Sequence, residues 1–149
     1  MNIRRAQEND VSAICAIDHI AHAEEERRQF ICRSVRDGIA FVAESDGEII
    51  GYSVLEHSFF ARGFIAMLMV RPDRRRSGIG SELVRHVEGL CASDRIFTST
   101  NESNLPMQSL LRKLGYKLSG KVDDLEPGDP ELFYSRQLRS KLGSDTIEK

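Results

Sequence analysis

The chain has 149 residues, of which 40% are hydrophobic and 30% are charged, and this composition excludes a globally disordered protein. Its 21 Lys and Arg residues against 23 Asp and Glu give a formal net charge of -2, so a strongly basic nucleic-acid binder is not expected. We expect a single domain over 1–139 and a flexible tail over 140–149, because that last segment is polar and has no periodicity.

The sequence shows no signal for export or for a membrane. No apolar run approaches the roughly 20 residues that span a bilayer, and the opening MNIRRAQEND has no apolar core. The cysteines Cys15, Cys32 and Cys91 form no CxxC pair, which is typical of small buried thiols in a reducing compartment. We therefore expect a cytoplasmic protein with no membrane partner. We expect no metal site, because the histidines show no ligand spacing with the cysteines.

Hydrophobic periodicity and turn residues predict a mixed α/β fold around one sheet. Apolar residues at helical spacing follow the capping residues Asn9 and Asp10, and Asp46-Gly47 is a hairpin signal. A second turn is predicted over Phe59–Gly63. The predicted strands are Met1–Ala6, Ile39–Glu44, Glu48–His57, Phe64–Arg71, Arg95–Thr100, Tyr116–Val122 and Glu131–Leu138. The predicted helices are one from Val11 through Ile20, then Glu24–Arg36, Gly80–Ala92 and Asn104–Leu114.

The most informative segment runs from Met67 to Val84, where a strand leads through RPDRRRSGIG into an amphipathic helix. Glycines at 78 and 80 let a ligand approach the backbone, and the first N–H groups of a helix have no partner within it. The helix dipole and the arginines at 74, 75 and 76 add positive charge. The segment therefore predicts a phosphate or pyrophosphate site. The spacing fits neither a Walker A loop nor a dinucleotide fingerprint.

Arg75-Arg-Ser-Gly78-Ile-Gly80 resembles the [Q/R]-x-x-G-x-[G/A] signature of the GNAT superfamily of N-acetyltransferases. The resemblance extends to the strand ending in Met69-Val-Arg-Pro72 and to the helix that opens at Asn104 and closes with Lys113-Leu-Gly-Tyr116. The order of elements up to Leu138 is similar as well. The resemblance implies a small single-domain GNAT-like α/β fold. Its mostly antiparallel sheet would be splayed between the fourth and fifth strands and flanked by about four helices.

The resemblance also implies an activity, which is transfer of an acetyl group from acetyl-CoA to a primary amine of a small molecule or peptide. The strand backbone ending at Val70 would pair with the pantetheine arm, and the backbone from Arg75 to Gly80 would cradle the pyrophosphate. Dimers are common among such proteins, so a homodimer is one expected state. The implied cofactor-binding residues are Leu68, Met69, Val70, Arg75, Arg76, Ser77, Gly78, Ile79, Gly80, Ser81 and Asn104.

Two positions that hold catalytic side chains in many members of the family are apolar here. The usual proton-donating tyrosine corresponds to Leu111, and a glutamate base corresponds to Phe64. Tyr116 and Tyr134 are other candidate acids, although aromatic packing in the core is the simpler interpretation of each. Glu and His at 56 and 57 are candidate bases, although a solvated strand end is the simpler interpretation there. We assign no catalytic residue from the sequence.

The acidic segment Asp123–Glu131 contains five carboxylates between turn signals. A solvated hairpin loop is the simpler interpretation, and a rim that attracts a cationic amine through Asp124 and Glu131 is the functional one. The same two interpretations, a solvated face or a substrate-attracting one, apply to Glu24–Glu26, which corresponds to the variable substrate-lid region of the family.

Three hypotheses remain open at this stage. The chain is an acetyl-CoA-dependent N-acetyltransferase, a non-catalytic acyl-CoA-binding or sensor domain, or a phosphate- or nucleic-acid-binding module that uses Arg71–Arg76. Turnover on an amine separates the first from the second, and salt-sensitive oligonucleotide binding is the mark of the third.

Overall fold

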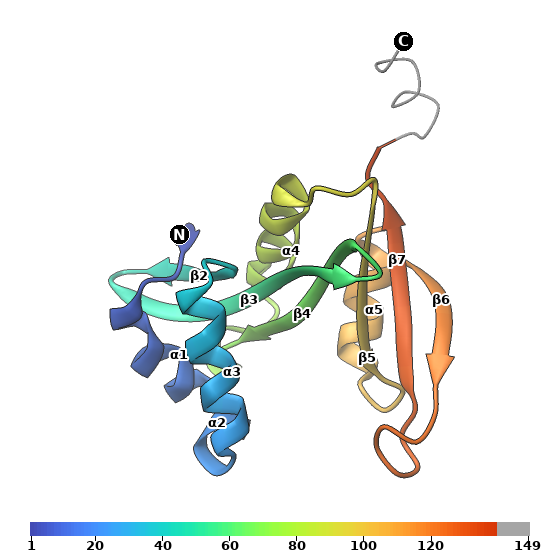
Figure 1. Cartoon of the computed structure of the whole chain (residues 1–149). Helices are drawn as coiled ribbons and strands as arrows, with labels where there is room; N and C mark the ends of the chain where they lie inside the picture. The colour runs from blue at the N-terminus through green and yellow to red at the C-terminus, as the bar shows by residue number, and fades with distance from the viewer. Residues whose placement is uncertain (140–149) are drawn as a thin grey trace. The chain divides into compact units, whose positions relative to one another are not determined.

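The computed structural model describes residues 1–139 and confirms a mixed α/β fold (Figure 1). Seven strands form one sheet in the order β1-β2-β3-β4-β5-β7-β6. β4 and β5 pair in parallel, whereas β1–β2, β2–β3, β5–β7 and β6–β7 pair antiparallel. The strands are β1 (Asn2–Arg5), β2 (Ala40–Ser45), β3 (Glu48–Phe59), β4 (Arg62–Val70), β5 (Arg95–Asn101), β6 (Lys117–Val122) and β7 (Glu131–Gln137). The α-helices of the described chain are α1 (Val11–Ile17), α2 (His19–Ala23), α3 (Glu25–Arg36), α4 (Ile79–Leu90) and α5 (Leu105–Lys113).

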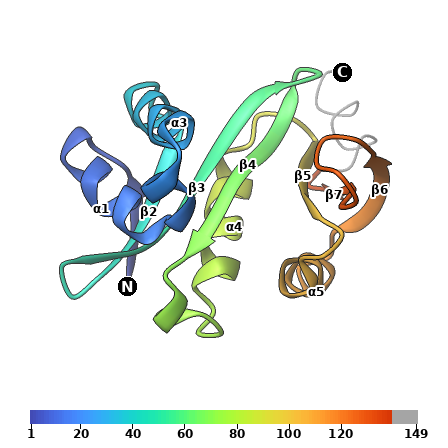
Figure 2. The same cartoon turned by 90° about the horizontal axis from the view of Figure 1, so that it is seen from below.

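The chain forms two compact units. The first comprises Met1–Leu55 and Met67–Gly89, and the second comprises Glu56–Ala66 and the described residues from Leu90 onward. In the first unit, α1, α2 and α3 lie on one side of the strands and α4 lies on the other (Figures 1 and 2). In the second unit, α5 lies along one side of β5, β7 and β6 (Figures 1 and 2). Segment 140–149, which we expected to be a tail, lies outside the described residues.

The predicted helix from Val11 through Ile20 is wrong in one respect, because Asp18 divides it into α1 and α2. The Asp18 backbone is extended, with φ -95° and ψ 100°. Its Oδ1 accepts hydrogen bonds from the N–H groups of Ile20 at 3.0 Å and Ala21 at 3.3 Å. Asp18 thus caps a new helix in place of continuing the old one, which is why residues 1–139 contain five α-helices where about four were expected.

The predicted turn over Phe59–Gly63 is shorter in the structure. β3 continues through Phe59, and the turn consists of Phe60 and Ala61, with φ values of 51° and 63°. Gly63 belongs to β4, and a Cβ at this position would lie 2.3 Å from the Cys91 sulfur. Gly63 is therefore a close-packing residue of the strand, not a turn residue.

The start of α4 is fixed on the sheet of the first unit by a small buried cluster. Ile79 and Leu83 of α4 pack with Ala43 and Ile50, and Leu68 and Val70 of β4 pack against the same cluster. Gly51 permits this approach, because a Cβ there would meet the Met69 carbonyl oxygen at 3.0 Å and Leu83 Cδ1 at 3.1 Å. The end of β4 and the first turn of α4 are therefore fixed in position relative to each other.

A methyl group at Gly51 is expected to destabilise the protein. Gly51→Ala places its Cβ 3.0 Å from the Met69 carbonyl oxygen, a backbone atom that shifts less readily than the end of a flexible side chain, so we expect a loss of about 1–3 kcal/mol in the free energy of unfolding, measured in urea. Gly89→Ala is the matched control, because a Cβ at Gly89 of α4 meets nothing within 4 Å. Equal stability of the two variants would show that the contact at Gly51 relaxes without cost.

The sequence prediction of three buried thiols is right for Cys91 only, since Cys15 is half-buried and Cys32 is exposed. Within residues 1–139, no group of three or more His, Cys, Asp or Glu side chains is placed to hold a metal ion. In the same part of the chain no helix is both long and apolar enough to cross a membrane.

Candidate functional site

The segment between β4 and α4 forms a basic turn in the first unit. β4 ends at Val70, a short 3-10 turn covers Pro72–Arg74, and α4 begins at Ile79, one residue before the predicted start. Arg76 and Gly78 have positive φ values of 65° and 85° and flank Ser77. A Cβ at Gly78 would meet nothing within 4 Å, so the space over this residue is open. Such alternation of backbone conformation is typical of a concave array of N–H groups that takes an anion.

Three N–H groups at the start of α4 have no partner in the described chain. The first backbone bond of the helix runs from the Glu82 N–H to the Gly78 carbonyl, at 3.1 Å. The N–H groups of Ile79, Gly80 and Ser81 precede it, and helix geometry offers them no acceptor. α4 has 12 residues, enough for its dipole to place partial positive charge at this end. The first turn of α4 is therefore able to bind an anion.

The arginines of the turn are in different environments. Arg75 is exposed, and its Nε donates to the Val70 carbonyl oxygen at 3.1 Å, which ties the turn back to the end of β4. Arg71 is held by Asp73 at 2.6 Å and Glu48 at 3.2 Å, and hydrogen bonding from Arg71 lowers the pKa of Asp73. The side chains of Arg74 and Arg76 make no hydrogen bond or ion pair within residues 1–139, although the Arg74 charge helps to lower the pKa of Asp73, so both guanidinium groups can meet an anionic ligand.

Arg75→Ala is expected to weaken acetyl-CoA binding only modestly. We expect backbone N–H groups to make the main anion contacts, and an exposed guanidinium contributes about 1 kcal/mol, or roughly a fivefold change in Kd. Isothermal calorimetry with acetyl-CoA measures the effect. Complete loss of binding in a folded Arg75→Ala protein would contradict this division between backbone and side chain.

The predicted arm-binding residues Leu68, Met69 and Val70 lie at the end of β4. The pairs between β4 and β5 run from Gly63–Ile96 to Ile65–Thr98, although β4 continues to Val70. The backbone of these last residues is therefore not used by the β4–β5 ladder. Ten of the predicted cofactor-binding residues lie in this strand, the basic turn and the first turn of α4, all in the first unit.

Asn104, the eleventh predicted residue, belongs to the second unit and caps α5. Its Oδ1 accepts a hydrogen bond from the Met107 N–H at 3.2 Å. Gln108, on the same helix, donates to the carbonyl oxygens of Asn101 and Glu102 at 3.3 and 2.7 Å. Leu111 is 1% exposed. The position of the usual proton-donating tyrosine is therefore filled by a core leucine that offers no acid.

Three of the other candidate acids and bases of the second unit are engaged in packing or hydrogen bonding, whereas the fourth, Glu56, is a half-buried residue of β3. Tyr116 and Tyr134 are each 2% exposed, as expected for core aromatics. His57 Nε2 accepts the Ala92 N–H at 2.9 Å, so that nitrogen is already occupied. Phe64 stacks against other rings, 4.9 Å from Phe59 between centroids. No general acid or base emerges from these residues.

Most of the acidic segment Asp123–Glu131, including Asp124, is exposed as expected for a solvated loop, but three hydrogen bonds anchor it. Ser99 donates to Glu131 at 2.7 Å, and Ser103 donates to Asp129 at 2.6 Å. Asn101 donates to Glu126 at 3.1 Å. These three bonds fix the loop to the end of β5 and to the turn that follows it. No local pattern indicates these bonds, because each donor lies at least 25 residues before its acceptor in the chain.

Two named proteins are similar to this chain in sequence. The chain is 29% identical over 132 residues to a protein named N-alpha-acetyltransferase from Sulfurisphaera tokodaii, covering 77% of this chain and 79% of the relative. It is 29% identical over 140 residues to a peptidyl-lysine N-acetyltransferase, YjaB, of Salmonella typhimurium, covering 84% and 90%.

A GNAT-family acetyltransferase structure from Bacillus cereus superposes with a TM-score of 0.86 at 31% identity, over 93% of this chain and 98% of that one. An aminoglycoside 6'-N-acetyltransferase complexed with coenzyme A shares the fold, with a TM-score of 0.77 at 16% identity over 95% and 99%. The family model described as acetyltransferase (GNAT) family matches residues 7–116. The chain therefore belongs to the GNAT family of acetyltransferases.

Proposed function

We propose that this protein transfers the acetyl group of acetyl-CoA to a primary amine of a small molecule or peptide, in a ternary complex. The observation that carries this proposal is the start of α4, where three unpartnered N–H groups follow the open backbone of Gly78. A diphosphate suits this cradle, because it takes several N–H donors at once and its charge is favoured by the helix dipole. The guanidinium groups of Arg74 and Arg76 strengthen the attraction.

The end of β4 supplies the second element of the cofactor site. A pantetheine arm has two amide groups, which suit the backbone donors and acceptors of an unused strand edge. The backbone of Leu68 to Val70 offers such an edge beyond the last β4–β5 pair at Ile65, with the Val70 carbonyl oxygen shared with Arg75 Nε. Packing of Leu68 and Val70 against Ile79 and Leu83 keeps this edge and the phosphate cradle at a constant separation.

The reaction requires little from side chains. The unprotonated amine attacks the thioester carbonyl carbon, and collapse of the tetrahedral intermediate breaks the C–S bond and releases coenzyme A as a thiolate. The proton lost by the amine passes to water, since Leu111 and Phe64 provide neither the acid nor the base. Alignment of amine and thioester then accounts for most of the rate. A dependence on the free amine is the corollary, with activity rising toward the pKa of the acceptor.

The names of the relatives favour a peptide amine over a small amine. One is an N-alpha-acetyltransferase and the other is a peptidyl-lysine N-acetyltransferase, and both align with more than three quarters of this chain. The acceptor panel therefore needs α-amino peptides and lysine-containing peptides with blocked N-termini, beside polyamines and aminoglycosides.

A second candidate function is binding of acyl-CoA without turnover, and Leu111 favours it. A leucine that is 1% exposed at the tyrosine position cannot protonate the leaving thiolate. Such a domain would keep the phosphate cradle and lose the chemistry. It predicts acetyl-CoA affinity that no amine converts into thiol release.

One experiment separates the two functions. Acetyl-CoA binding is measured by calorimetry, and release of free thiol is followed with the amine panel. Binding with turnover on any amine establishes the transferase and names its acceptor class. Binding without turnover on every amine favours the acyl-CoA-binding domain. Absence of binding contradicts the phosphate cradle and both candidates with it.

A further inference from the structure

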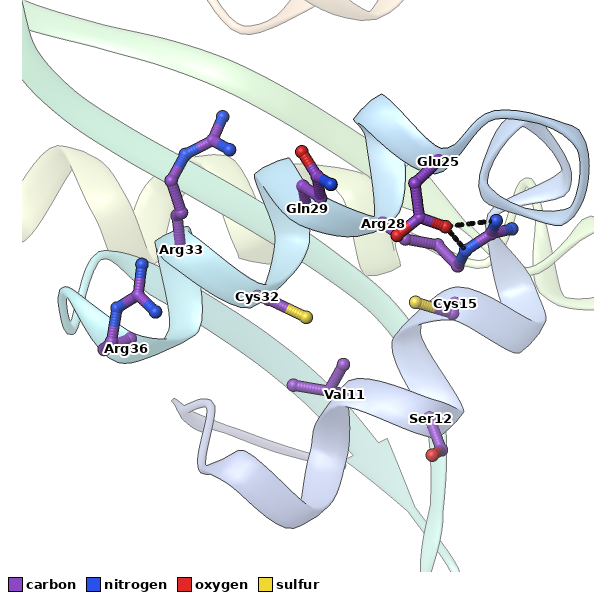
Figure 3. A pocket seen from close by; sticks show the side chains of 9 residues that line it. All are labelled: Val11, Ser12, Cys15, Glu25, Arg28, Gln29, Cys32, Arg33 and Arg36. Carbon is purple, nitrogen blue, oxygen red and sulfur yellow. Dashed lines mark hydrogen bonds and ion pairs between the residues drawn. The ribbon is translucent and has the colours of Figure 1, made fainter.

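A groove of about 670 Å³ lies between α1 and α3 in the first unit, and no residue of the basic turn lines it (Figure 3). One wall is a stripe of α1, made by Val11, Ser12 and Cys15, and the other is a stripe of α3 that includes Cys32. The positions on each wall repeat every three or four residues, so the two stripes face each other along the helices. The groove thus brings together Cys15 and Cys32, which are 17 positions apart in the sequence.

The two thiols of the groove point toward one another. Figure 3 shows the Cys15 sulfur directed from α1 and the Cys32 sulfur directed from α3 into the space between the helices. Neither sulfur has a hydrogen-bond partner within residues 1–139. Cys91, by contrast, lies in the second unit, is buried and contacts Ser93 at 3.3 Å. Cys15 and Cys32 therefore form a pair from which Cys91 is separate.

Accessibility and electrostatics give the two thiols different roles. Cys32 is exposed and open to reagents from solvent, whereas Cys15 is half-buried. Burial raises the pKa of Cys15, and the neighbouring Cys32 and Asp18 raise it further. A thiol that resists ionisation is a poor first nucleophile and remains available to react second.

We propose that Cys15 and Cys32 are a modification site, at which a small disulfide such as oxidised glutathione drives closure of a Cys15–Cys32 disulfide between α1 and α3. The Cys32 thiolate attacks one sulfur of the reagent, forms a mixed disulfide and releases one small thiol. Cys15 then loses its proton and attacks the Cys32 sulfur, which releases the second small thiol. Two electrons pass from the protein pair to the reagent, and the protein loses two hydrogen atoms.

The bond would clamp the segment that contains α2. Cys15 precedes Asp18, and Cys32 follows Arg27, so the covalent loop encloses the ion pair that joins these two residues at 2.8 Å. Closing a loop of about 17 residues restricts the unfolded chain and is expected to raise Tm by about 8 °C. The segment between the helices would then be held both by the bond and by the buried ion pair.

The test uses the full-length protein in oxidised glutathione, followed by alkylation under denaturing conditions and mapping of the peptides by mass spectrometry. We expect one peptide pair joined through Cys15 and Cys32, an alkylated Cys91, and a higher Tm that dithiothreitol reverses. A mixed disulfide that persists on Cys32 with Cys15 alkylated overturns the proposal. So does a Cys32–Cys32 bond between two chains, or three alkylated cysteines.

Serine variants assign the order of the two steps. In Cys15→Ser, Cys32 is expected to stop as the glutathione adduct with no rise in Tm. In Cys32→Ser, Cys15 is expected to stay reduced over the same period. Fast formation of an adduct on Cys15 in the second variant would contradict the order of attack. The peptide map of the parent protein, which carries no serine substitution, decides whether the Cys15–Cys32 bond forms even where a variant does not fold.

Discussion

We expect Gly78→Val to abolish acetyl-CoA binding, with a loss of affinity of at least about 100-fold, which is close to 3 kcal/mol. Gly78 has a φ of 85°, and the space over it is open. A branched side chain would fill the volume in which a diphosphate approaches the backbone. It would also strain a backbone conformation that L side chains rarely adopt, at a further cost of about 1–2 kcal/mol. Both effects would keep the diphosphate away from the backbone N–H groups.

Gly47→Val is the matched control for that prediction. Gly47 lies in the turn between β2 and β3, has a φ of 78° and likewise has nothing within 4 Å of an added Cβ. The two variants therefore share the backbone strain but not the position at the start of α4. Calorimetry with acetyl-CoA and thermal unfolding are measured on both. Retained affinity in a folded Gly78→Val protein, or equal loss in Gly47→Val, would contradict our placement of the diphosphate.

The basic turn could be predicted from the sequence because its signals are local. Glycines and arginines within RPDRRRSGIG identify the turn, and the apolar spacing after them identifies α4, so strand, turn and helix are adjacent in both sequence and space. Gly51 also had a signal, because an isolated glycine inside a strand pattern indicates close backbone approach. Which atoms approach it depends on Met69 and Leu83, and no pattern around Gly51 names them.

The division between α1 and α2 could not be predicted in the same way. Ile14, Ile17 and Ile20 keep a helical spacing across Asp18, so the apolar pattern favours one continuous helix. The break depends on the partners that Asp18 finds in the folded protein, and one of them, Tyr52, lies 34 residues away. The predicted turn over Phe59–Gly63 contains Phe60 and Ala61 but is longer than the observed one. Neither of these two residues favours a positive φ, so the pattern gives no reason to confine the turn to them.

Asp18→Ala is expected to lower the free energy of unfolding by about 3–5 kcal/mol at pH 7. Asp18 is fully buried, and its Oδ2 accepts hydrogen bonds from Tyr52 at 2.5 Å and Arg27 at 2.8 Å. Removal of the carboxylate leaves the fully buried Tyr52 hydroxyl without an acceptor and the Arg27 charge without its counterion. Tyr52→Phe removes only one bond to a charged group, and we expect a loss of about 1.5–3 kcal/mol.

Glu25→Gln is the control for this network. Glu25 pairs with Arg28 one helical turn away, but its side chain is 64% exposed, so the expected loss is at most about 0.5 kcal/mol. Unfolding in urea is measured for all three variants and the parent protein. A loss for Asp18→Ala no larger than that for Glu25→Gln would mean that desolvation cancels the buried contacts.

The pH dependence of stability tests whether the charge of Asp18 is the source of its stabilising effect. Burial alone would raise the pKa of Asp18, but the hydrogen bonds from Tyr52 and Arg27 outweigh it, and the pKa is lower than the usual 3.8. A lowered pKa in the folded state means that the stabilisation is complete above the unfolded value and is lost as the pH falls through the folded one. The stability difference between the parent and Asp18→Asn should therefore be constant from pH 7 to about 5 and shrink below pH 4. A difference that stays the same at pH 3 would show that shape, not charge, makes Asp18 necessary at the junction of α1 and α2.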